Sequence, residues 1–226
     1  MRKILLAALF AALPIIAFTS KASAQGYIEG SVGFLVTNSV ETDEFSSATS
    51  LGIFTGTIDF DYDAQWAAGF EGGYMVGPWR FGASWDWIGS SVSSAHVVGL
   101  LNGAPFDAYA TDQELEDDYG ISGNRDINIF AANGYYQFNT VGLGGPVGGV
   151  QPYLGIGLGA ATFQNANTTF AFLITAGANY VLGQNFYLGG RYRLGIISGP
   201  TSDSGVKFGE ITTHTFSLVL GYRFPV

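Results

Sequence analysis

Seven charged residues have the types and the spacing needed to form ion pairs. They lie in segments whose side chains alternate between apolar and non-apolar, and all seven take non-apolar positions: Glu29, Glu71, Arg80, Asp86, Arg191, Arg193 and Arg223. An arginine guanidinium carries five N–H donors and keeps its charge, so one arginine can bridge two carboxylates. If these faces enclose a common interior, the residues predict a two-layered ionic network inside it. We expect Glu29 to pair with Arg223, because the last segment of a closed structure must meet the first.

Little else in the chain could support catalysis. There is no cysteine, and the two histidines are His96 and His214, which excludes disulfides, thiol catalysis and metal sites built on thiolates. Ser217 follows His214 by three positions, and a period of two places their side chains on opposite faces. A histidine–serine pair for acyl hydrolysis is therefore missing, and we expect neither enzymatic activity nor a cofactor.

Most of the remaining acids crowd into a few segments. Asp59, Asp61 and Asp63 occupy alternate positions, and a second acidic run covers residues 112–118. Carboxylate oxygens are the ligands that Ca²⁺ and Mg²⁺ prefer, so the three aspartates are weak candidates for a divalent cation. Their spacing is not that of an EF-hand, and solvated, mutually repelling charge is the interpretation we favour. The sequence therefore predicts no metal site.

The N-terminus has the pattern of an export signal. Arg2 and Lys3 precede an apolar run over residues 4–18, and Ala22-Ser23-Ala24 is a typical cleavage site. We expect a signal peptide over residues 1–24, cleaved after Ala24, and one domain over residues 25–226. An uncleaved anchor is the alternative, although the run is short for a span. With 9 basic against 18 acidic residues, nucleic-acid binding is excluded.

The elements that must position the charges are strands. Apolar residues recur with a period of two in eight segments, at residues 27–36, 66–76, 79–87, 130–138, 153–160, 170–182, 186–196 and 215–224. The opposite face is rich in the chain's 33 glycines. Glycine makes a poor solvated face but suits the crowded lumen of an eight-stranded barrel. The apolar face then points outward into lipid, which predicts an all-β, eight-stranded, antiparallel up-and-down transmembrane β-barrel.

Aromatic residues and connection lengths agree with that fold. Aromatics that gather toward segment ends predict a lipid-facing girdle: Trp66, Tyr74, Trp79, Trp85, Trp87, Phe138, Tyr180, Phe186, Tyr222 and Phe224. Gly77-Pro78 and residues 183–185 are short turns that alternate with long, acidic connections. The alternative is a β-sandwich with an aromatic core.

Several stretches resemble a known family. QPYLGIGLGAA, TAGANYVLGQNFYLGGRYRLG, ANGYYQF and THTFSLVLGYRF are similar to the small outer-membrane β-barrel surface antigens of α-proteobacteria. The resemblance covers most of the chain and implies an eight-stranded, OmpA-type barrel without a peptidoglycan-binding domain. It also implies an association with lipopolysaccharide or host contact and a role in envelope integrity. Such barrels usually end on an aromatic residue that the barrel-assembly machinery reads, whereas Pro225 and Val226 follow Phe224 here.

Together these observations predict a surface protein in the outer membrane of a Gram-negative bacterium. The expected role is structural or interactive, with the lumen plugged by the arginine–carboxylate network. Its partners would be outer-membrane lipid and lipopolysaccharide, the assembly machinery, and a host or surface ligand of the loops. A small, low-conductance porin is the first alternative, and a lipid-modifying enzyme is the second.

Overall fold

A computed structural model describes residues 24–49, 52–89, 92–111, 113–114, 126–138, 149–164, 166–202 and 205–225. Apart from Ala24, the expected signal peptide lies outside these residues. No helix in the described ranges is long and apolar enough to cross a membrane.

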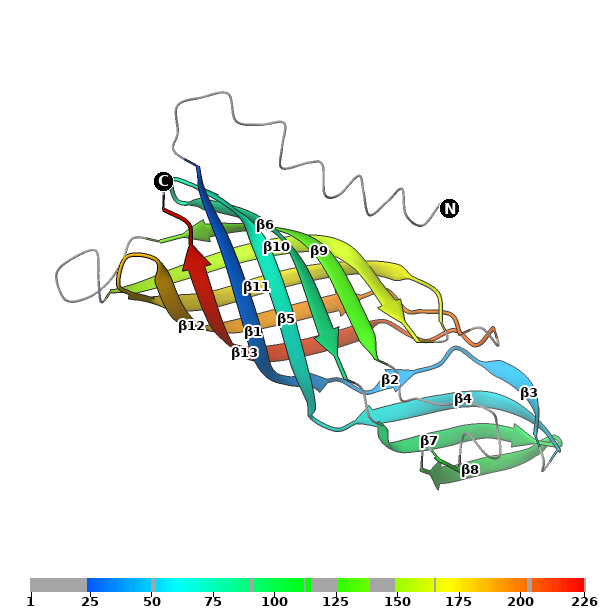
Figure 1. The fold of residues 1–226 in the computed structure, drawn as a ribbon. Helices are drawn as coiled ribbons and strands as arrows, with labels where there is room; N and C mark the ends of the chain where they lie inside the picture. Colours follow the sequence, from blue (N-terminus) through cyan, green and yellow to red (C-terminus); the bar gives the residue numbers. More distant parts are fainter. Residues whose placement is uncertain are drawn as a thin grey trace.

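Eight antiparallel strands close into a barrel (Figure 1). The order around the barrel follows the chain, and the last strand pairs with the first, so the predicted up-and-down topology is confirmed. All eight segments expected from the sequence are barrel strands. They are β1 (Gln25–Thr37), β5 (Gln65–Val76), β6 (Trp79–Ile88), β9 (Ile127–Gln137), β10 (Val150–Phe163), β11 (Thr169–Leu182), β12 (Phe186–Ile197) and β13 (Ile211–Arg223).

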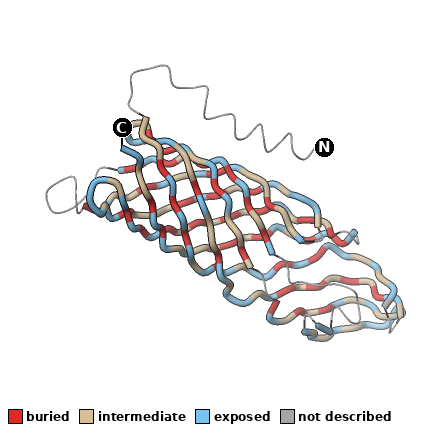
Figure 2. Tube along the Cα trace, in the orientation of Figure 1, coloured by how far each residue is buried: buried red, intermediate tan, exposed pale blue. Residues whose placement is uncertain are grey.

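The apolar faces of these strands point away from the barrel axis. Figure 2 shows buried positions recurring between intermediate and exposed ones along the barrel strands. Six large residues on the predicted outer face have between 44% and 65% of their surface exposed: Phe70, Trp85, Leu154, Ile156, Leu158 and Leu218. A wall with this composition suits lipid and not water.

A second sheet, which is absent from the predicted fold, extends from one end of the barrel (Figure 1). Its strands are β2 (Val40–Glu41), β3 (Phe45–Thr49), β4 (Gly52–Tyr62), β7 (Val92–Leu101) and β8 (Ala104–Ala110). The expectation that these connections are loops is wrong for β4, because Phe54, Ile58 and Phe60 alternate with polar residues and are fully buried. We call this the outer sheet, and the barrel end that carries it the sheet end.

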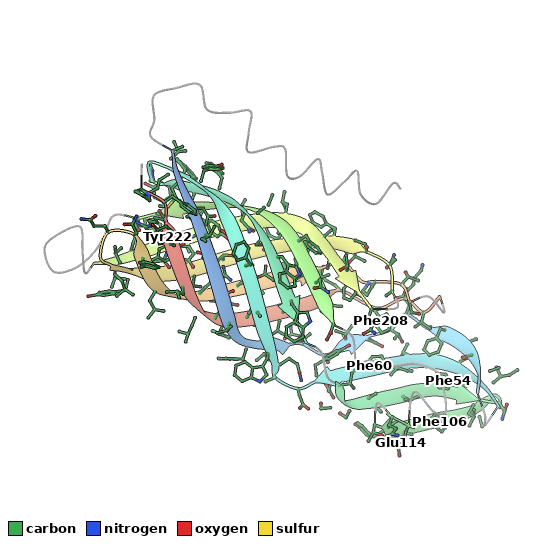
Figure 3. All side chains as sticks on the ribbon, in the orientation of Figure 1. Phe54, Phe60, Phe106, Glu114, Phe208 and Tyr222 are labelled. Atoms are coloured by element: carbon green, nitrogen blue, oxygen red, sulfur yellow. The ribbon has the colours of Figure 1, made fainter. Side chains whose placement is uncertain are left out.

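The apolar core joins the outer sheet to the barrel. Phe60 packs against Phe208 with ring centroids 5.9 Å apart, and Phe54 contacts Phe106 at 6.2 Å within the sheet (Figure 3). The same core continues into the barrel, where its members line the lumen near the sheet end: Leu35, Ala67, Ile88, Ile127, Ile129, Leu173, Ile197 and Ile211. The lumen is therefore mainly apolar in this half, which corrects the expectation that only glycine and charge fill it.

At the opposite end, which we call the termini end, β1 begins and β13 ends. Gly77 and Gly183 adopt positive φ angles of 58° and 70° in the two expected tight turns, a backbone region that glycine enters without a steric penalty. The backbone N–H of Phe224 donates to the carbonyl of Gly26 over 2.9 Å, just before Pro225, which has no N–H to donate.

Candidate functional site

Glu71 is the centre of a polar cluster in the lumen. Its carboxylate accepts hydrogen bonds from the hydroxyls of Tyr27 and Tyr135, each over 2.6 Å, and from the amide of Asn133 over 3.1 Å. Arg80 donates to it over 2.8 Å, and Arg193 lies 3.5 Å away. Only 1% of Glu71 is exposed, so these donors replace the water that a buried carboxylate loses.

Glu29 forms the second hub of the cluster. Arg80 lies 2.6 Å from one carboxylate oxygen and Arg191 2.8 Å from the other, while the Tyr187 hydroxyl donates to Glu29 over 2.9 Å. Arg80 thus bridges Glu29 and Glu71 through Nη2, which carries two N–H donors. The two expected layers are therefore joined into one network.

Asp86 closes the network on the side of the sheet end. It is paired with Arg193, and its other oxygen is 3.9 Å from Arg191. Three carboxylates and three arginines are thus linked by ion pairs: Glu29, Glu71, Asp86, Arg80, Arg191 and Arg193. Their charges cancel, and we call these six residues the lumen network.

Buried tyrosines surround the network, and glycines make room for them. Tyr27, Tyr135, Tyr153 and Tyr187 are each 1% exposed, and the Arg80 guanidinium lies 4.1 Å from the ring centre of Tyr27. A Cβ added at Gly221 would lie 2.0 Å from Tyr187. The sequence signal was present, because all four tyrosines take lumen-facing positions of the period of two.

Arg223 does not join the network, so the expected pair with Glu29 is wrong. The register of β1 and β13 sets Glu29 opposite Gly221, and Arg223 opposite Tyr27. The Tyr187 side chain fills the space over Gly221 and donates to Glu29. Arg223 instead donates to the amide oxygen of Gln151 over 2.7 Å.

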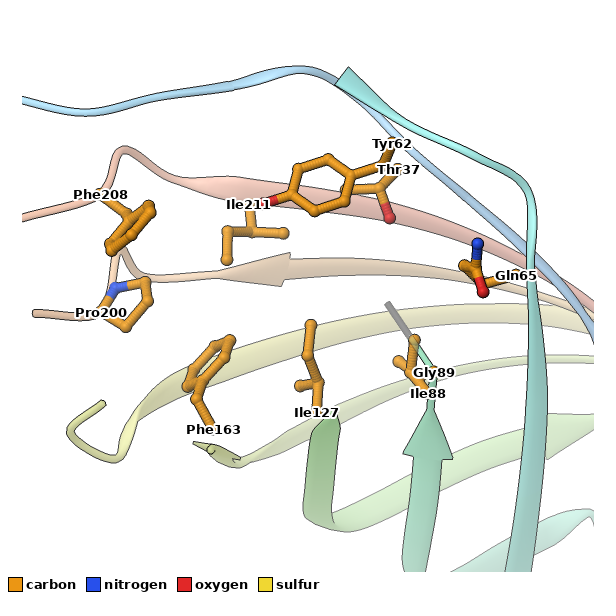
Figure 4. Close-up of a pocket in the computed structure, with 10 residues that line it drawn as sticks. All are labelled: Thr37, Tyr62, Gln65, Ile88, Gly89, Ile127, Phe163, Pro200, Phe208 and Ile211. Carbon is orange, nitrogen blue, oxygen red and sulfur yellow. The ribbon is translucent and has the colours of Figure 1, made fainter. Parts of the chain in front are cut away.

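Beyond the network, apolar packing narrows the lumen. A pocket lies where the barrel meets the outer sheet, between Tyr62, Phe163 and Phe208 (Figure 4). Its empty space is about 470 Å³, which includes space open to solvent, and the centre of a water-sized sphere can occupy about 20 Å³ of it. A second small space, in which the centre of a water-sized sphere can also occupy about 20 Å³, lies between Leu173 and the network. Each has room for about one water molecule.

The aromatic residues expected in the girdle lie on the outer wall. Eight of the ten are at least 42% exposed: Trp66, Tyr74, Trp79, Trp85, Phe138, Tyr180, Phe186 and Phe224. Trp87 and Tyr222 are half-buried. Tyr222 packs against Phe186 with ring centroids 4.8 Å apart, near the termini end of the barrel (Figure 3).

The candidate cation ligands lie in or beside the outer sheet. Asp59 and Asp61 belong to β4, and Asp63 follows it. Within the described residues, no three acidic or histidine side chains are grouped closely enough to hold a metal ion. Partial burial, with Asp61 and Glu41 nearby, raises the pKa of Asp59.

The two histidines lie apart from each other. His96 is 2.7 Å from a carboxylate oxygen of Asp107 on the outer sheet and stacks on Tyr109. His214 Nδ1 forms a hydrogen bond of 2.8 Å with the hydroxyl of Tyr192 on the outer wall. Ser217 lines the lumen-side pocket beside the network, on the face of β13 opposite His214.

Comparisons with known proteins agree with the barrel. A family model described as the outer membrane protein beta-barrel domain matches residues 4–224. Neisserial surface protein A shares 15% identity, with 89% of this chain and 99% of that chain covered and a TM-score of 0.54. OprG from Pseudomonas aeruginosa shares 18% identity over 89% and 97% of the two chains, with a TM-score of 0.46. No curated protein matches the chain.

Proposed function

The chain belongs to the outer membrane protein beta-barrel family, and on that premise we propose that it is a closed surface barrel with a structural or interactive role. A Gram-negative outer membrane is its location. Residues 1–24 would direct export and be removed after Ala24. The outer sheet would face the cell exterior and the termini end the periplasm, since the short turns lie there.

The observation that carries this proposal is the filled lumen. The network places Glu29, Glu71 and Arg80 in the barrel interior, with at most 2% of any of them exposed. Mainly apolar side chains line the lumen from the network to the sheet end. An ion would have to break buried ion pairs and then cross an apolar constriction, and such constrictions exclude water.

The outer sheet supplies a surface for contacts. Its outward face carries Ile53, Val98, Leu100 and Tyr109, which are 41% to 75% exposed, beside the acids Asp59, Asp61 and Asp107. Apolar groups exposed together on a water-facing surface often mark an interaction site. The acidic charge favours a partner that is basic, or lipopolysaccharide bridged by divalent cations. Recognition of the C-terminal strand by the assembly machinery would use residues 222–224.

Planar-bilayer recording tests the proposal against the porin alternative. The full mature chain, refolded and shown to be heat-modifiable on gels, should give no stable conductance steps. An Arg80→Gln variant, which opens the ion-pair chain, serves as the sensitised comparison. Reproducible steps from the unmodified chain would contradict the closed barrel and favour a low-conductance porin. The same preparation should release no fatty acid from lipid A, because His214 and Ser217 lie on opposite faces of β13.

A further inference from the structure

The lumen holds one more positive charge than its ion pairs neutralise. Three arginines and three acids cancel within the lumen network, and Arg223 is a fourth lumen-facing arginine. No aspartate or glutamate lies near it in sequence either. The described segments at the termini end, residues 25–28, 72–82, 134–138, 149–153, 178–190 and 220–225, contain no Asp or Glu. In the described part of the chain, Arg223 forms no salt bridge.

The position of Arg223 is fixed by several contacts. Its backbone N–H donates to the carbonyl of Asn185 over 2.7 Å, and the Asn185 amide donates back to the carbonyl of Arg223 over 2.7 Å. From β13 the side chain reaches Gln151 on β10, while its guanidinium carbon lies 5.1 Å from the ring centre of Tyr187. A neutral amide oxygen orients the guanidinium but leaves its charge uncompensated.

Polar groups without a hydrogen-bond partner lie at the same end of the lumen. Asn179 is opposite Gln151 in the β10–β11 register, and Tyr153 lies two residues along β10 on the same face, opposite Gln137. Asn179, Tyr153 and Gln137 are each at most 3% exposed. Among the described residues, the Asn179 amide, the Tyr153 hydroxyl, the Gln137 amide nitrogen and Arg223 Nε have no hydrogen-bond partner. Most of these atoms are donors, and buried donors are nearly always paired.

We propose that the termini end of the lumen binds a small oxyanion of the phosphate class, held by Arg223 with Asn179 and Tyr153 as further donors. An uncompensated arginine beside neutral donors is the arrangement that recognises phosphate, because charge-assisted bonds to its oxygens are strong and directional. The phosphate could come from free periplasmic anion or from a phospholipid headgroup of the inner leaflet. The two sources share this chemistry and are separated by the experiment.

The free-anion arm uses the full mature chain in maltoside micelles, which contain no phosphate. Inorganic phosphate replaces chloride at constant ionic strength, and thermal unfolding is followed by tryptophan fluorescence. The midpoint should rise by about 5–10 °C at one hundred times the Kd. Arg223→Gln should abolish the rise. Lys207→Gln makes the same charge change on the exposed outer surface and should retain it.

The lipid arm uses native mass spectrometry after incubation with phosphatidylglycerol. Retention of the lipid by the unmodified chain and not by Arg223→Gln, without a midpoint rise in free phosphate, assigns the site to the headgroup. No Arg223-dependent response in either arm overturns the proposal, because water alone then satisfies these groups.

A second variant guards against misfolding of Arg223→Gln. Asn179→Asp places a carboxylate beside Gln151 and supplies the charge that Arg223 lacks. The variant should melt at a higher temperature in phosphate-free buffer and lose its response to phosphate. A full phosphate response in Asn179→Asp would overturn the proposal, since the site would then not involve the Arg223 charge.

Discussion

Replacing Arg80 with glutamine should be among the most damaging single changes in the barrel. Arg80 is 1% exposed, and its Nη2 lies 2.6 Å from Glu29 and 2.8 Å from Glu71. Without it, three carboxylates face two arginines in a place that water does not reach. Removing one partner of a buried ion pair costs about 3–5 kcal/mol. At about 1.4 kcal/mol for each factor of ten, the folded fraction should fall relative to the unfolded fraction by roughly two to three and a half orders of magnitude.

Urea titration of the barrel in lipid vesicles, followed by tryptophan fluorescence and gel mobility, measures this loss. Lys207→Gln is the matched control, because Lys207 is exposed and exposed pairs contribute about 0–1 kcal/mol. In Glu71→Gln/Arg80→Gln the network keeps equal numbers of acids and bases, so the double variant should lose less than the sum of the two single changes. If Arg80→Gln and Lys207→Gln were equally stable, the lumen network would not be the stabilising element inferred from its geometry.

Three further substitutions test the outer sheet core, the lipid-facing wall and the acidic surface of the outer sheet. Phe60→Ala removes a fully buried ring and should cost about 3–5 kcal/mol of folding free energy. Hydrogen exchange should become faster in β4 and β7 and stay unchanged in the barrel strands. Equal acceleration in the sheet and the barrel would contradict this. Ile156→Arg puts a charge on the lipid-facing wall and should cost about 2–4 kcal/mol in vesicle refolding, whereas Thr57→Arg, on the outer sheet, should cost little. Burial raises the pKa of Asp59 above its unfolded value, and the neighbouring charge of Asp61 raises it further. The outer sheet should therefore become more stable as the pH falls through this raised pKa, and less stable as the pH rises. Asp59→Asn should flatten this part of the pH profile of proteolysis, and an unchanged profile would refute the assignment.

The outer wall of the barrel was predictable because every strand that crosses lipid needs apolar side chains on its outer face. Leu154, Ile156 and Leu158 alternate with glycines, and only a closed barrel places such a face outward. The outer sheet is harder to predict because its segments also carry many acids, which are typical of solvated connections. The alternation of Phe54, Ile58 and Phe60 with Thr55 and Asp59 carries the same signal, and its acids belong to the exposed face.

The composition of the lumen network was more predictable than its pairing. The alternation of side chains along each strand identifies which charges face inward. Their ion-pair partners depend on the register and on the side chains that lie between the strands. Glu29 and Arg223 lie on adjacent strands, yet Tyr187 from the next strand comes between them. Cross-strand packing of this kind, with a tyrosine placed over a glycine, cannot be deduced from the alternation of a single strand.

Tryptophan quenching by phospholipids brominated on their acyl chains tests most directly whether the apolar side chains face lipid. All four tryptophans, Trp66, Trp79, Trp85 and Trp87, lie at outward positions of barrel strands, and three of them are at least 44% exposed. In vesicles containing the refolded chain, acyl-chain bromine should quench most of the fluorescence, while water-soluble acrylamide should have little effect. Strong quenching by acrylamide and none by the brominated lipid would contradict a barrel with lipid outside and paired charges within.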